Sequence, residues 1–405
     1  MMIYICSRMS NLPVESNSIP ISLAEEFRQL YGTRSRPEIF RAPGRVNLIG
    51  EHTDYNDGFV MPAAIDFDTW VAIAKREDRE LHVRSKQFHE DTKLLLSSLG
   101  GPPRKHWTDF PRGVAEVLQA SGRELSGADL IVDGRVPIGA GLSSSASIEV
   151  AIALALLAVS NTDMPLLELV KACQRAEHQF VGTLCGIMDQ FISVFGCAGH
   201  VLMLDCRSLQ YETLGIPTNV RLVISNTMVK HELAAGEYNR RRADCQTGVG
   251  ILRKHLPNVT ALRDVTLADL EKYRSDLPEV VYRRCRHVVS ENQRVLDAAK
   301  ALQTGDLLRF GELMSESHKS LRDDYEVSSS ELDLLVELAS GRDGVYGTRM
   351  TGGGFGGCTI TLVRSDTAER FQYDLAEAYK AKTGITPDVW ISTAAQGAGV
   401  WRERS

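Results

Sequence analysis

Residues 136–147 combine glycine, serine and alanine in a pattern that suits phosphate binding. They read VPIGAGLSSSAS and lie between a predicted strand and an apolar helix. Small residues let the backbone approach a ligand closely, and the free N–H groups and the dipole of a helix N-terminus attract anions. The segment lacks both the ending of a Walker A loop and the third glycine of a dinucleotide-binding fingerprint. A flexible loop whose serine caps the helix is the alternative.

Glu177 is a second candidate for chemistry because it lies on the apolar stripe of a predicted helix over 166–181. Burying a carboxylate is costly unless a cation or several donors meet it. Mg²⁺ prefers hard oxygen ligands and usually bridges protein to phosphate oxygens, so Glu177 is a candidate Mg²⁺ ligand, with Ser145 supplying a second oxygen. A Glu at the edge of the stripe, paired with Lys or Arg, is the alternative.

Polar side chains also gather directly after a short apolar strand around 46–49. Glu51, His52 and Asp54 fall within four residues. Loops mounted on a rigid strand are common places for ligand binding, and two carboxylates with an imidazole suit several hydroxyls of a sugar. A solvated turn is the alternative.

Asp189 lies in an otherwise apolar stretch, CGIMDQF, at 185–191. It suits a base near a substrate hydroxyl, with Arg45 as the charge partner that keeps it ionised. A helix cap or an Asx turn would also place an aspartate there. The functional interpretation requires the fold to bring Arg45 and Asp189 together.

The segment GGGFGG at 352–357 contains five glycines, which is more backbone freedom than a tight hairpin needs. The pattern favours a close approach of this turn to a ligand or to the phosphate loop. A hairpin is the simpler alternative.

The elements that must position these residues form an α+β pattern without strict βαβ alternation. Strands are expected around 46–49, 59–65, 70–74, 81–83, 130–132, 201–204, 220–225, 358–363 and 389–392, with a turn at 56–58. Helices are expected over 112–120, 145–159, 166–181 and 367–380, and they dominate between 237 and 339.

The chain has 405 residues, which at about 150 residues per domain suggests two or three domains, two being the safer number. We expect an irregular N-terminal arm over 1–20, an N-terminal domain over 21–216 and a C-terminal domain over 217–405. A composition of 43% hydrophobic and 24% charged residues is that of an ordinary globular protein.

A net charge of −6 argues against nucleic acids and anionic membranes as partners. Eight scattered cysteines without a C-x-x-C pair indicate reduced thiols, and the longest apolar run, 150–159, is too short to span a bilayer. We therefore expect a soluble cytoplasmic protein, and a monomer.

Three blocks in this order resemble the GHMP kinases: the block at 43–47, the phosphate loop at 139–145 and the glycine-rich turn at 352–357. The longer segment GRVNLIGEHTDYN at 44–56 resembles the galactokinase motif in particular. So do CGIMDQ at 185–190, KHEL at 230–233, EYNRRR at 237–242 and SESH at 315–318. The likeness runs from about residue 23 to residue 390.

This resemblance implies a two-domain GHMP kinase-like fold of the α+β class, with mixed and antiparallel sheets and the active site in the inter-domain cleft. It implies ATP-dependent phosphorylation of galactose at the anomeric hydroxyl, giving galactose 1-phosphate and ADP, the first committed step of galactose catabolism. Galactose and ATP would be the substrates and Mg²⁺ the cofactor.

The resemblance also assigns roles to individual residues. Arg45 would stabilise the transition state, and Asp189 would be the base or an orienting anion. Ser145 and Glu177 would bind Mg²⁺. The residues implied to contact the sugar are Glu51, His52, Thr53, Asp54, Gly186 and Tyr238, and those implied to contact ATP are Ser85, Gly139, Ala140, Gly141, Leu142, Ser143, Ser144 and Ser145.

Two positions depart from the family pattern. Ala140 stands where glycine is common, which is harmless if its φ is negative, and Ser330 stands where proline is common, which affects only a helix start. Three alternatives stay open: a kinase for another sugar such as N-acetylgalactosamine or arabinose, a catalytically silent galactose-and-ATP sensor, and a plain nucleotide-binding scaffold. The intact Ser145 and Asp189 favour an enzyme, and the sugar block argues against the scaffold.

Overall fold

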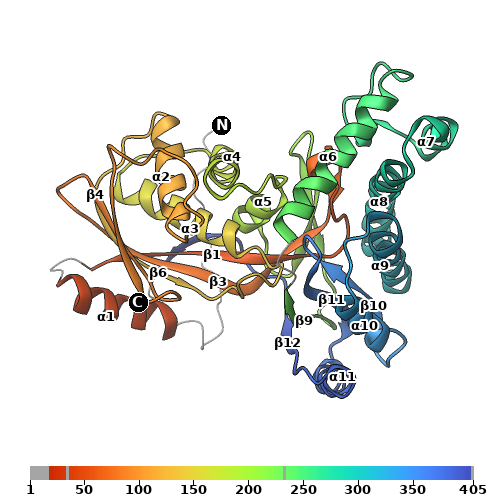
Figure 1. Cartoon of the computed structure of the whole chain (residues 1–405). Helices are drawn as coiled ribbons and strands as arrows, with labels where there is room; N and C mark the ends of the chain where they lie inside the picture. The colour runs from red at the N-terminus through yellow and green to blue at the C-terminus, as the bar shows by residue number, and fades with distance from the viewer. Residues whose placement is uncertain (1–17, 33–35, 231–233, 403–405) are drawn as a thin grey trace.

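The structure is a computed structural model that describes residues 18–32, 36–230 and 234–402 (Figure 1). Its strands are β1 (Glu38–Asn47), β2 (Phe59–Val60), β3 (Pro62–Lys75), β4 (Glu80–Ser85), β5 (Glu90–Leu95), β6 (Ala128–Gly134), β7 (His200–Asp205), β8 (Tyr211–Gly215), β9 (Val220–Lys230), β10 (Val345–Thr351), β11 (Gly356–Arg364), β12 (Asp388–Ser392) and β13 (Gly399–Trp401).

The α-helices are α1 (Ser18–Tyr31), α2 (Asp109–Ala120), α3 (Ser144–Val159), α4 (Leu166–Ala176), α5 (Met188–Phe195), α6 (Ala234–Leu252), α7 (Leu267–Lys272), α8 (Glu279–Thr304), α9 (Leu307–Ser320), α10 (Ser330–Ala339) and α11 (Ala368–Thr383). Two π-helical turns, Glu177–Val181 and Leu321–Tyr325, continue α4 and α9.

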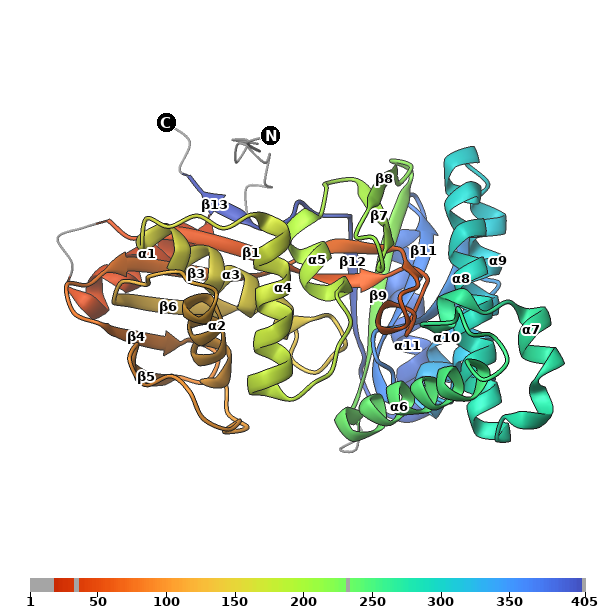
Figure 2. The same cartoon turned by 90° about the horizontal axis from the view of Figure 1, so that it is seen from above.

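One half of the molecule is built on a six-stranded sheet in the order β13-β1-β3-β6-β4-β5 (Figure 2). Only the β4–β6 pair is parallel, so the sheet is mixed, as expected. Side chains alternate between its faces. Val71 and Ile73 join the core under α2–α5, whereas Trp70 and Ala72 pack with Phe27 of α1 on the other face.

The other half is built on the antiparallel sheet β10-β11-β9-β12 (Figure 1). Leu222 and Ile224 of β9 pack with Phe310 of α9 on one face. Val223, between them, packs with Leu335 of α10 on the opposite face, where α11 also lies. A third, small sheet, β2-β7-β8, completes the set of strands in the described chain.

The two halves are joined through a shared apolar core. Val46 and Leu48, from β1 and the segment after it, belong to the same buried cluster as Ile360 of β11 and Phe310 of α9. The end of the chain also returns to the first half, because β13 pairs with β1. The domain boundary at residue 217 stays a prediction, and three residues near the C-terminus lie in the sheet of the first half.

Two expectations about elements were wrong. Residues 18–20 belong to α1 and not to the irregular arm; the rest of that arm, 1–17, lies outside the described residues. The segments 59–65 and 70–74 are mostly one strand, β3, which continues through Asp66 and Asp68 although its pairing with β1 shifts register there, between Pro43 and Arg45. The ranges that the structure describes contain no helix long and apolar enough to cross a membrane.

Candidate active site

A cavity of about 250 Å³ lies where three loops meet. We call them the phosphate loop (residues 137–143), the polar loop (residues 50–58) and the glycine-rich turn (residues 352–357). The cavity is lined by Arg45, Glu51, His52, Asp54, Gly139, Gly141, Leu142, Ser143, Ser144, Ser145, Glu177, Thr183, Cys185, Met188, Asp189, Tyr238, Gly352 and Gly353. Most of the residues predicted from the sequence therefore converge on one site.

The phosphate loop connects β6 to α3 and depends on residues that tolerate positive φ. Gly139 and Gly141 have φ of +68° and +76°, and Ser143 has φ of +61°. Ala140 is not among the positive-φ residues of the described chain, which explains why alanine suits that position. The loop delivers Ser144 and Ser145 to the first turn of α3, where backbone N–H groups lack intrahelical partners.

The glycine-rich turn packs directly against the phosphate loop. A Cβ atom on Gly352 would lie 2.6 Å from the Gly141 carbonyl oxygen, and one on Gly357 would lie 2.8 Å from the Ala140 carbonyl oxygen. Both glycines also have positive φ, of +83° and +85°. The close approach predicted from the five glycines is confirmed.

Arg45 and Asp189 form the most directional contact in the cavity. The Arg45 Nε and Nη2 atoms donate to the two Asp189 carboxylate oxygens, each at 2.8 Å. Ser143 Oγ donates to the same carboxylate at 2.5 Å, and Arg45 Nη1 donates to the Gly141 carbonyl at 2.5 Å. Burial alone would lower the pKa of Arg45, but the charges of Asp189 and Glu51 outweigh it and raise that pKa.

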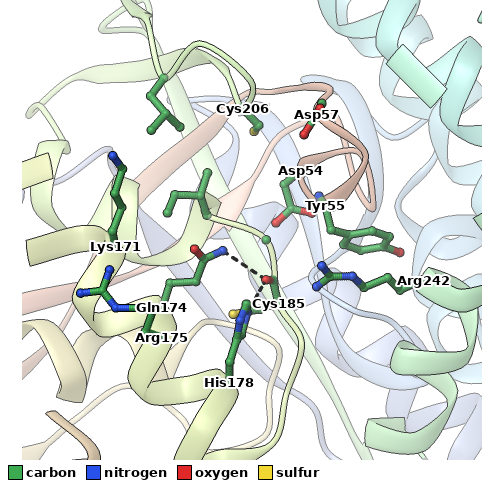
Figure 3. A pocket seen from close by; sticks show the side chains of 13 residues that line it. Asp54, Tyr55, Asp57, Lys171, Gln174, Arg175, His178, Cys185, Cys206 and Arg242 are labelled. Atoms are coloured by element: carbon green, nitrogen blue, oxygen red, sulfur yellow. Dashed lines mark hydrogen bonds between the residues drawn. The ribbon is translucent and has the colours of Figure 1, made fainter. Parts of the chain in front are cut away.

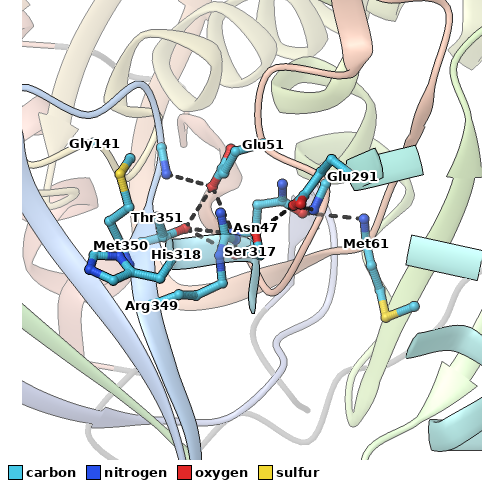
Figure 4. A network of polar contacts seen from close by, with 12 residues as sticks. Asn47, Glu51, Met61, Gly141, Glu291, Ser317, His318, Arg349, Met350 and Thr351 are labelled. Atoms are coloured by element: carbon cyan, nitrogen blue, oxygen red, sulfur yellow. Dashed lines mark hydrogen bonds and ion pairs between the residues drawn. The ribbon is translucent and has the colours of Figure 1, made fainter. Parts of the chain in front are cut away.

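Glu51 of the polar loop is held by groups from the other half of the molecule (Figure 4). Its Oε1 accepts hydrogen bonds from the Gly352 N–H at 2.7 Å and the Thr351 hydroxyl at 3.3 Å. The fully buried Arg349 lies 3.6 Å from the same oxygen and donates to the Asn47 carbonyl. Burial raises the pKa of Glu51, while Arg349 and Arg45 act in the opposite direction.

Glu291 of α8 anchors the start of the polar loop. Its Oε1 accepts from the Gly50 N–H at 2.9 Å and from Ser317 Oγ at 2.6 Å (Figure 4). Burial alone would raise the pKa of Glu291, but Arg294 and His287 outweigh it and lower that pKa to about 2. The carboxylate therefore stays charged and fixes the loop.

His52 lines the cavity and is surrounded by tyrosine rings. Its Nδ1 is 2.7 Å from the Tyr55 hydroxyl, which is 2.8 Å from the Tyr325 hydroxyl. The ring of Tyr238 is 5.5 Å from the imidazole, centroid to centroid. Burial lowers the pKa of His52 well below its ordinary value, so the imidazole is neutral and able to donate and accept hydrogen bonds.

Asp54 lies against the backbone of Gly186. A Cβ atom on Gly186 would lie 2.0 Å from Asp54 Oδ2, so only glycine leaves room for the carboxylate. Burial, with a further contribution from Asp189, raises the pKa of Asp54 to about 7. Asp54 is therefore close to its midpoint of titration at neutral pH.

A second cavity, of about 450 Å³, shares Asp54 and Cys185 with the first and is also lined by Gly186 (Figure 3). Gln174 of α4 and His178 of the π-helical turn that follows it both hydrogen-bond to the Cys185 carbonyl, at 3.3 and 2.8 Å. These bonds hold the segment that carries Gly186.

Glu177 begins the π-helical turn that follows α4, and such turns are frequent at functional sites. The residue is 6% exposed, and burial raises its pKa to about 7 in spite of a hydrogen bond from Ser145. The Ser145 hydroxyl and a buried carboxylate are the hard oxygen donors that Mg²⁺ prefers, so the residues present fit a Mg²⁺ ion.

A few predicted residues lie elsewhere. The Thr53 hydroxyl donates to the carbonyls of Gly50, in its own loop, and Phe59, at the start of β2. Ala140 is a buried residue of the phosphate loop and is not among the described residues that line the cavity. Ser85 ends β4, where its hydroxyl accepts from the Phe88 N–H, and it is not among the described residues that line the cavity. Residues 231–233 of the KHEL segment lie outside the described residues.

Three residues of the site were not predicted from the sequence: Arg349, Glu291 and Gln190. Gln190 hydrogen-bonds to Glu177, in addition to the predicted Ser145. The signals were weak but present. Arg349 lies in β10, three residues before the glycine-rich turn, and Gln190 directly follows Asp189. Glu291 carries no local signal, because it lies in a helix rich in charged residues.

Family signatures match most of the chain. The galactokinase galactose-binding signature matches residues 25–75. The GHMP kinases N terminal domain matches residues 109–197, and the GHMP kinases C terminal domain matches residues 298–381.

Curated relatives agree with these signatures. A galactokinase from Roseiflexus sp. (strain RS-1) is 46% identical over 377 residues, which cover 93% of this chain and 96% of the relative. A galactokinase from Chloroflexus aggregans is 48% identical over 374 residues, covering 92% and 95%.

Solved structures show the same fold. The crystal structure of Lactococcus lactis galactokinase complexed with galactose matches with a TM-score of 0.90 at 34% identity, covering 94% of this chain and 99% of that one. A mevalonate kinase matches with a TM-score of 0.61 at 17% identity, covering 88% and 98%, which is a likeness of fold alone. The expected two-domain α+β fold is confirmed.

Proposed function

This chain belongs to the galactokinase family of the GHMP kinases, and we propose that its cavity transfers the γ-phosphoryl group of ATP to the anomeric hydroxyl of galactose. The products are galactose 1-phosphate and ADP. The observation that carries the proposal is the bidentate Arg45–Asp189 pair, which lies between the phosphate loop and the polar loop. At that position the Asp189 carboxylate can orient the attacking hydroxyl, and the Arg45 guanidinium can stabilise the charge of the transferring phosphoryl group.

The phosphate loop and the N-terminus of α3 bind the phosphates of ATP in this proposal. Backbone N–H groups and the helix dipole provide the attraction, so a basic surface is not needed. This accounts for ATP binding by a chain whose net charge is −6. The positive φ angles of Gly139 and Gly141 shape the loop backbone around the phosphates.

Ser145 and Glu177 are the residues that would hold Mg²⁺. When bound, the ion supplies positive charge that neutralises the phosphate oxygens of the nucleotide. Glu177 contributes a carboxylate whose other oxygen is held by Gln190 at 2.9 Å, and Ser145 contributes a hydroxyl from the first turn of α3.

Phosphoryl transfer asks the protein mainly for alignment and for stabilising charge. Arg45 supplies the charge beside the transferring group. Asp189 accepts three hydrogen bonds, two from Arg45 and one from Ser143. A carboxylate offers about four acceptor positions, so one is left for the sugar hydroxyl. Asp189 orients that hydroxyl and receives its proton during or after transfer.

Selectivity for galactose comes from polar groups of fixed orientation around the sugar. Glu51, His52, Asp54 and Tyr238 line the cavity; Glu51 and His52 are held by hydrogen bonds, and Tyr238 packs beside the His52 ring. An epimer leaves a buried polar group unpaired, which costs about 1–3 kcal/mol per group. Glucose is therefore a poor substrate.

An ADP-release assay with galactose, talose, glucose, arabinose and N-acetylgalactosamine tests the proposal. We expect a clear preference for galactose, and ³¹P NMR of the product should show a phosphate on the anomeric oxygen. Preference for another sugar would indicate a different sugar kinase. Binding of galactose and ATP without ADP release would indicate the silent sensor. The cytoplasmic location and the monomeric state stay predictions.

A further inference from the structure

Glu149 and Gln190 are two buried polar residues to which the proposed mechanism gives no catalytic role. Glu149 is 1% exposed and lies in α3, four residues after Ser145 and therefore on the same face of the helix. Gln190 is 0% exposed and lies in the first turn of α5, next to Asp189. Both are surrounded by an otherwise apolar core, so their presence calls for a reason.

The two side chains form a bridge that ends at Glu177. Gln190 Nε2 donates to Glu177 Oε2 at 2.9 Å and to Glu149 Oε2 at 3.1 Å. Both N–H bonds of this amide are therefore used, one for each carboxyl group. A flip of the amide would turn its carbonyl oxygen toward two carboxyl groups, so Glu149 keeps the donor side of Gln190 facing Glu177.

The bridge is costly as a purely structural feature. Glu149 Oε1 and Gln190 Oε1 are buried and have no hydrogen-bond partner among the described residues. Buried carboxyl groups that repel one another and leave oxygens unpaired destabilise a fold. Apolar side chains of similar volume would fill this part of the core at lower cost, so a structural role alone does not explain the bridge.

We propose that Gln190 and Glu149 are positioning residues that orient the Glu177 carboxylate toward its cation. The inference rests on the proposed function, because it deepens the role given there to Glu177. Gln190 donates to Oε2 of the Glu177 carboxylate, the Ser145 hydroxyl also hydrogen-bonds to this carboxylate, and Glu149 fixes the orientation of the Gln190 amide. Partners behind a metal ligand commonly set metal affinity in this way.

The arrangement also links the cation site to the candidate base. Asp189 and Gln190 are consecutive residues at the start of α5. Asp189 accepts hydrogen bonds from Arg45, and Gln190 donates one to Glu177. A displacement of this turn therefore moves both groups together.

Binding of Mn²⁺ to the enzyme–ADP complex, followed by electron paramagnetic resonance, tests the proposal without relying on turnover. We expect Gln190→Met and Glu149→Leu to weaken Mn²⁺ binding about 10- to 100-fold. Glu149→Gln keeps an oxygen that accepts from Gln190 and should bind Mn²⁺ almost as well as the unsubstituted enzyme. The KM for galactose should stay unchanged in all three variants.

Ser193→Ala is the matched control. Ser193 lies in α5, as Gln190 does, and is 1% exposed. Its hydroxyl donates to the Pro43 carbonyl at 2.8 Å and not to Glu177. It should lower the melting temperature without weakening Mn²⁺ binding. Unchanged Mn²⁺ affinity in Gln190→Met, or equal losses in Glu149→Gln and Glu149→Leu, would overturn the proposal.

Glu177→Gln separates this inference from the proposed function. If that variant binds Mn²⁺ as tightly as the unsubstituted enzyme, the cation assignment and this inference are both wrong. Galactose-dependent ADP release by the unsubstituted enzyme would still support the phosphoryl-transfer proposal. Conversely, a lack of ADP release with the expected Mn²⁺ results would contradict only the proposed function.

Discussion

The guanidinium of Arg45 donates two hydrogen bonds of 2.8 Å to the carboxylate of Asp189, although the two residues are 144 positions apart. Arg45 comes from β1 and Asp189 from the first turn of α5. The third nitrogen of Arg45 donates to the Gly141 carbonyl of the phosphate loop. Arg45 therefore ties the candidate base to the loop proposed to hold the nucleotide, so that alignment of the two substrates depends on one side chain.

Asp189→Asn should lower kcat by about 10²- to 10⁴-fold, the usual contribution of a positioned acid or base. The amide cannot take the proton of the sugar hydroxyl, and it pairs poorly with Arg45. Affinity for ATP should change little, because the phosphate loop binds through its backbone. Steady-state kinetics and nucleotide titration check this, and equal losses in turnover and ATP affinity would contradict the role of Asp189.

Gly186→Ala should raise the KM for galactose while ATP binding is preserved. The added Cβ would lie 2.0 Å from Asp54 Oδ2, which forces the Asp54 carboxylate out of its position. Gly250→Ala is the control, because that helical glycine has no atom within 4 Å of the added Cβ. We expect the control to keep its galactose KM and to be slightly stabilised, since alanine favours helix. A normal KM in Gly186→Ala would argue against sugar contact by Asp54.

Arg349→Met should lower the free energy of unfolding by about 3–5 kcal/mol, because it removes the stronger of the two positive charges, Arg349 and Arg45, that stabilise the buried Glu51. Adding Glu51→Gln to this variant should recover part of the loss, since no unpaired charge then remains. Urea unfolding of the two single variants and the double variant gives the coupling. Arg309→Met, which removes an exposed ion pair with Glu312, should change stability little. Additive effects of Arg349→Met and Glu51→Gln would contradict the pairing.

Asp54 should make the protein less stable as pH rises. Its pKa is raised to about 7 in the folded protein from an ordinary value of 3.8, so the folded state holds a proton that the unfolded chain has lost. The stabilisation is fully present below about pH 4 and is lost as pH rises to about 7. The stability gained by Asp54→Asn over the unsubstituted protein should be roughly 2.5 kcal/mol larger at pH 8 than at pH 5. Urea unfolding of both proteins at the two pH values measures this gain. An equal difference in stability between the two proteins at pH 5 and pH 8 would contradict the raised pKa of Asp54.

The sequence by itself determined the parts of the site that depend on local backbone requirements. The phosphate loop was predictable because a glycine and serine segment before an apolar helix has few structural uses. The close approach of the glycine-rich turn was predictable because five glycines in six residues allow contacts that side chains would block, as Gly352 shows against Gly141. Helical periodicity also placed Glu177 in the interior, where it is 6% exposed.

Only the tertiary structure decided which distant side chains meet. The contact of Glu51 with Arg349 spans both halves of the molecule, and the bridge from Gln190 to Glu149 and Glu177 joins three helical segments. The pairing of β13 with β1 likewise joins segments from opposite ends of the chain. Such contacts depend on how sheets and helices pack. No spacing of residues along the sequence reveals them. The chemistry of each residue was therefore readable one segment at a time, whereas the partner that orients it was set by the fold.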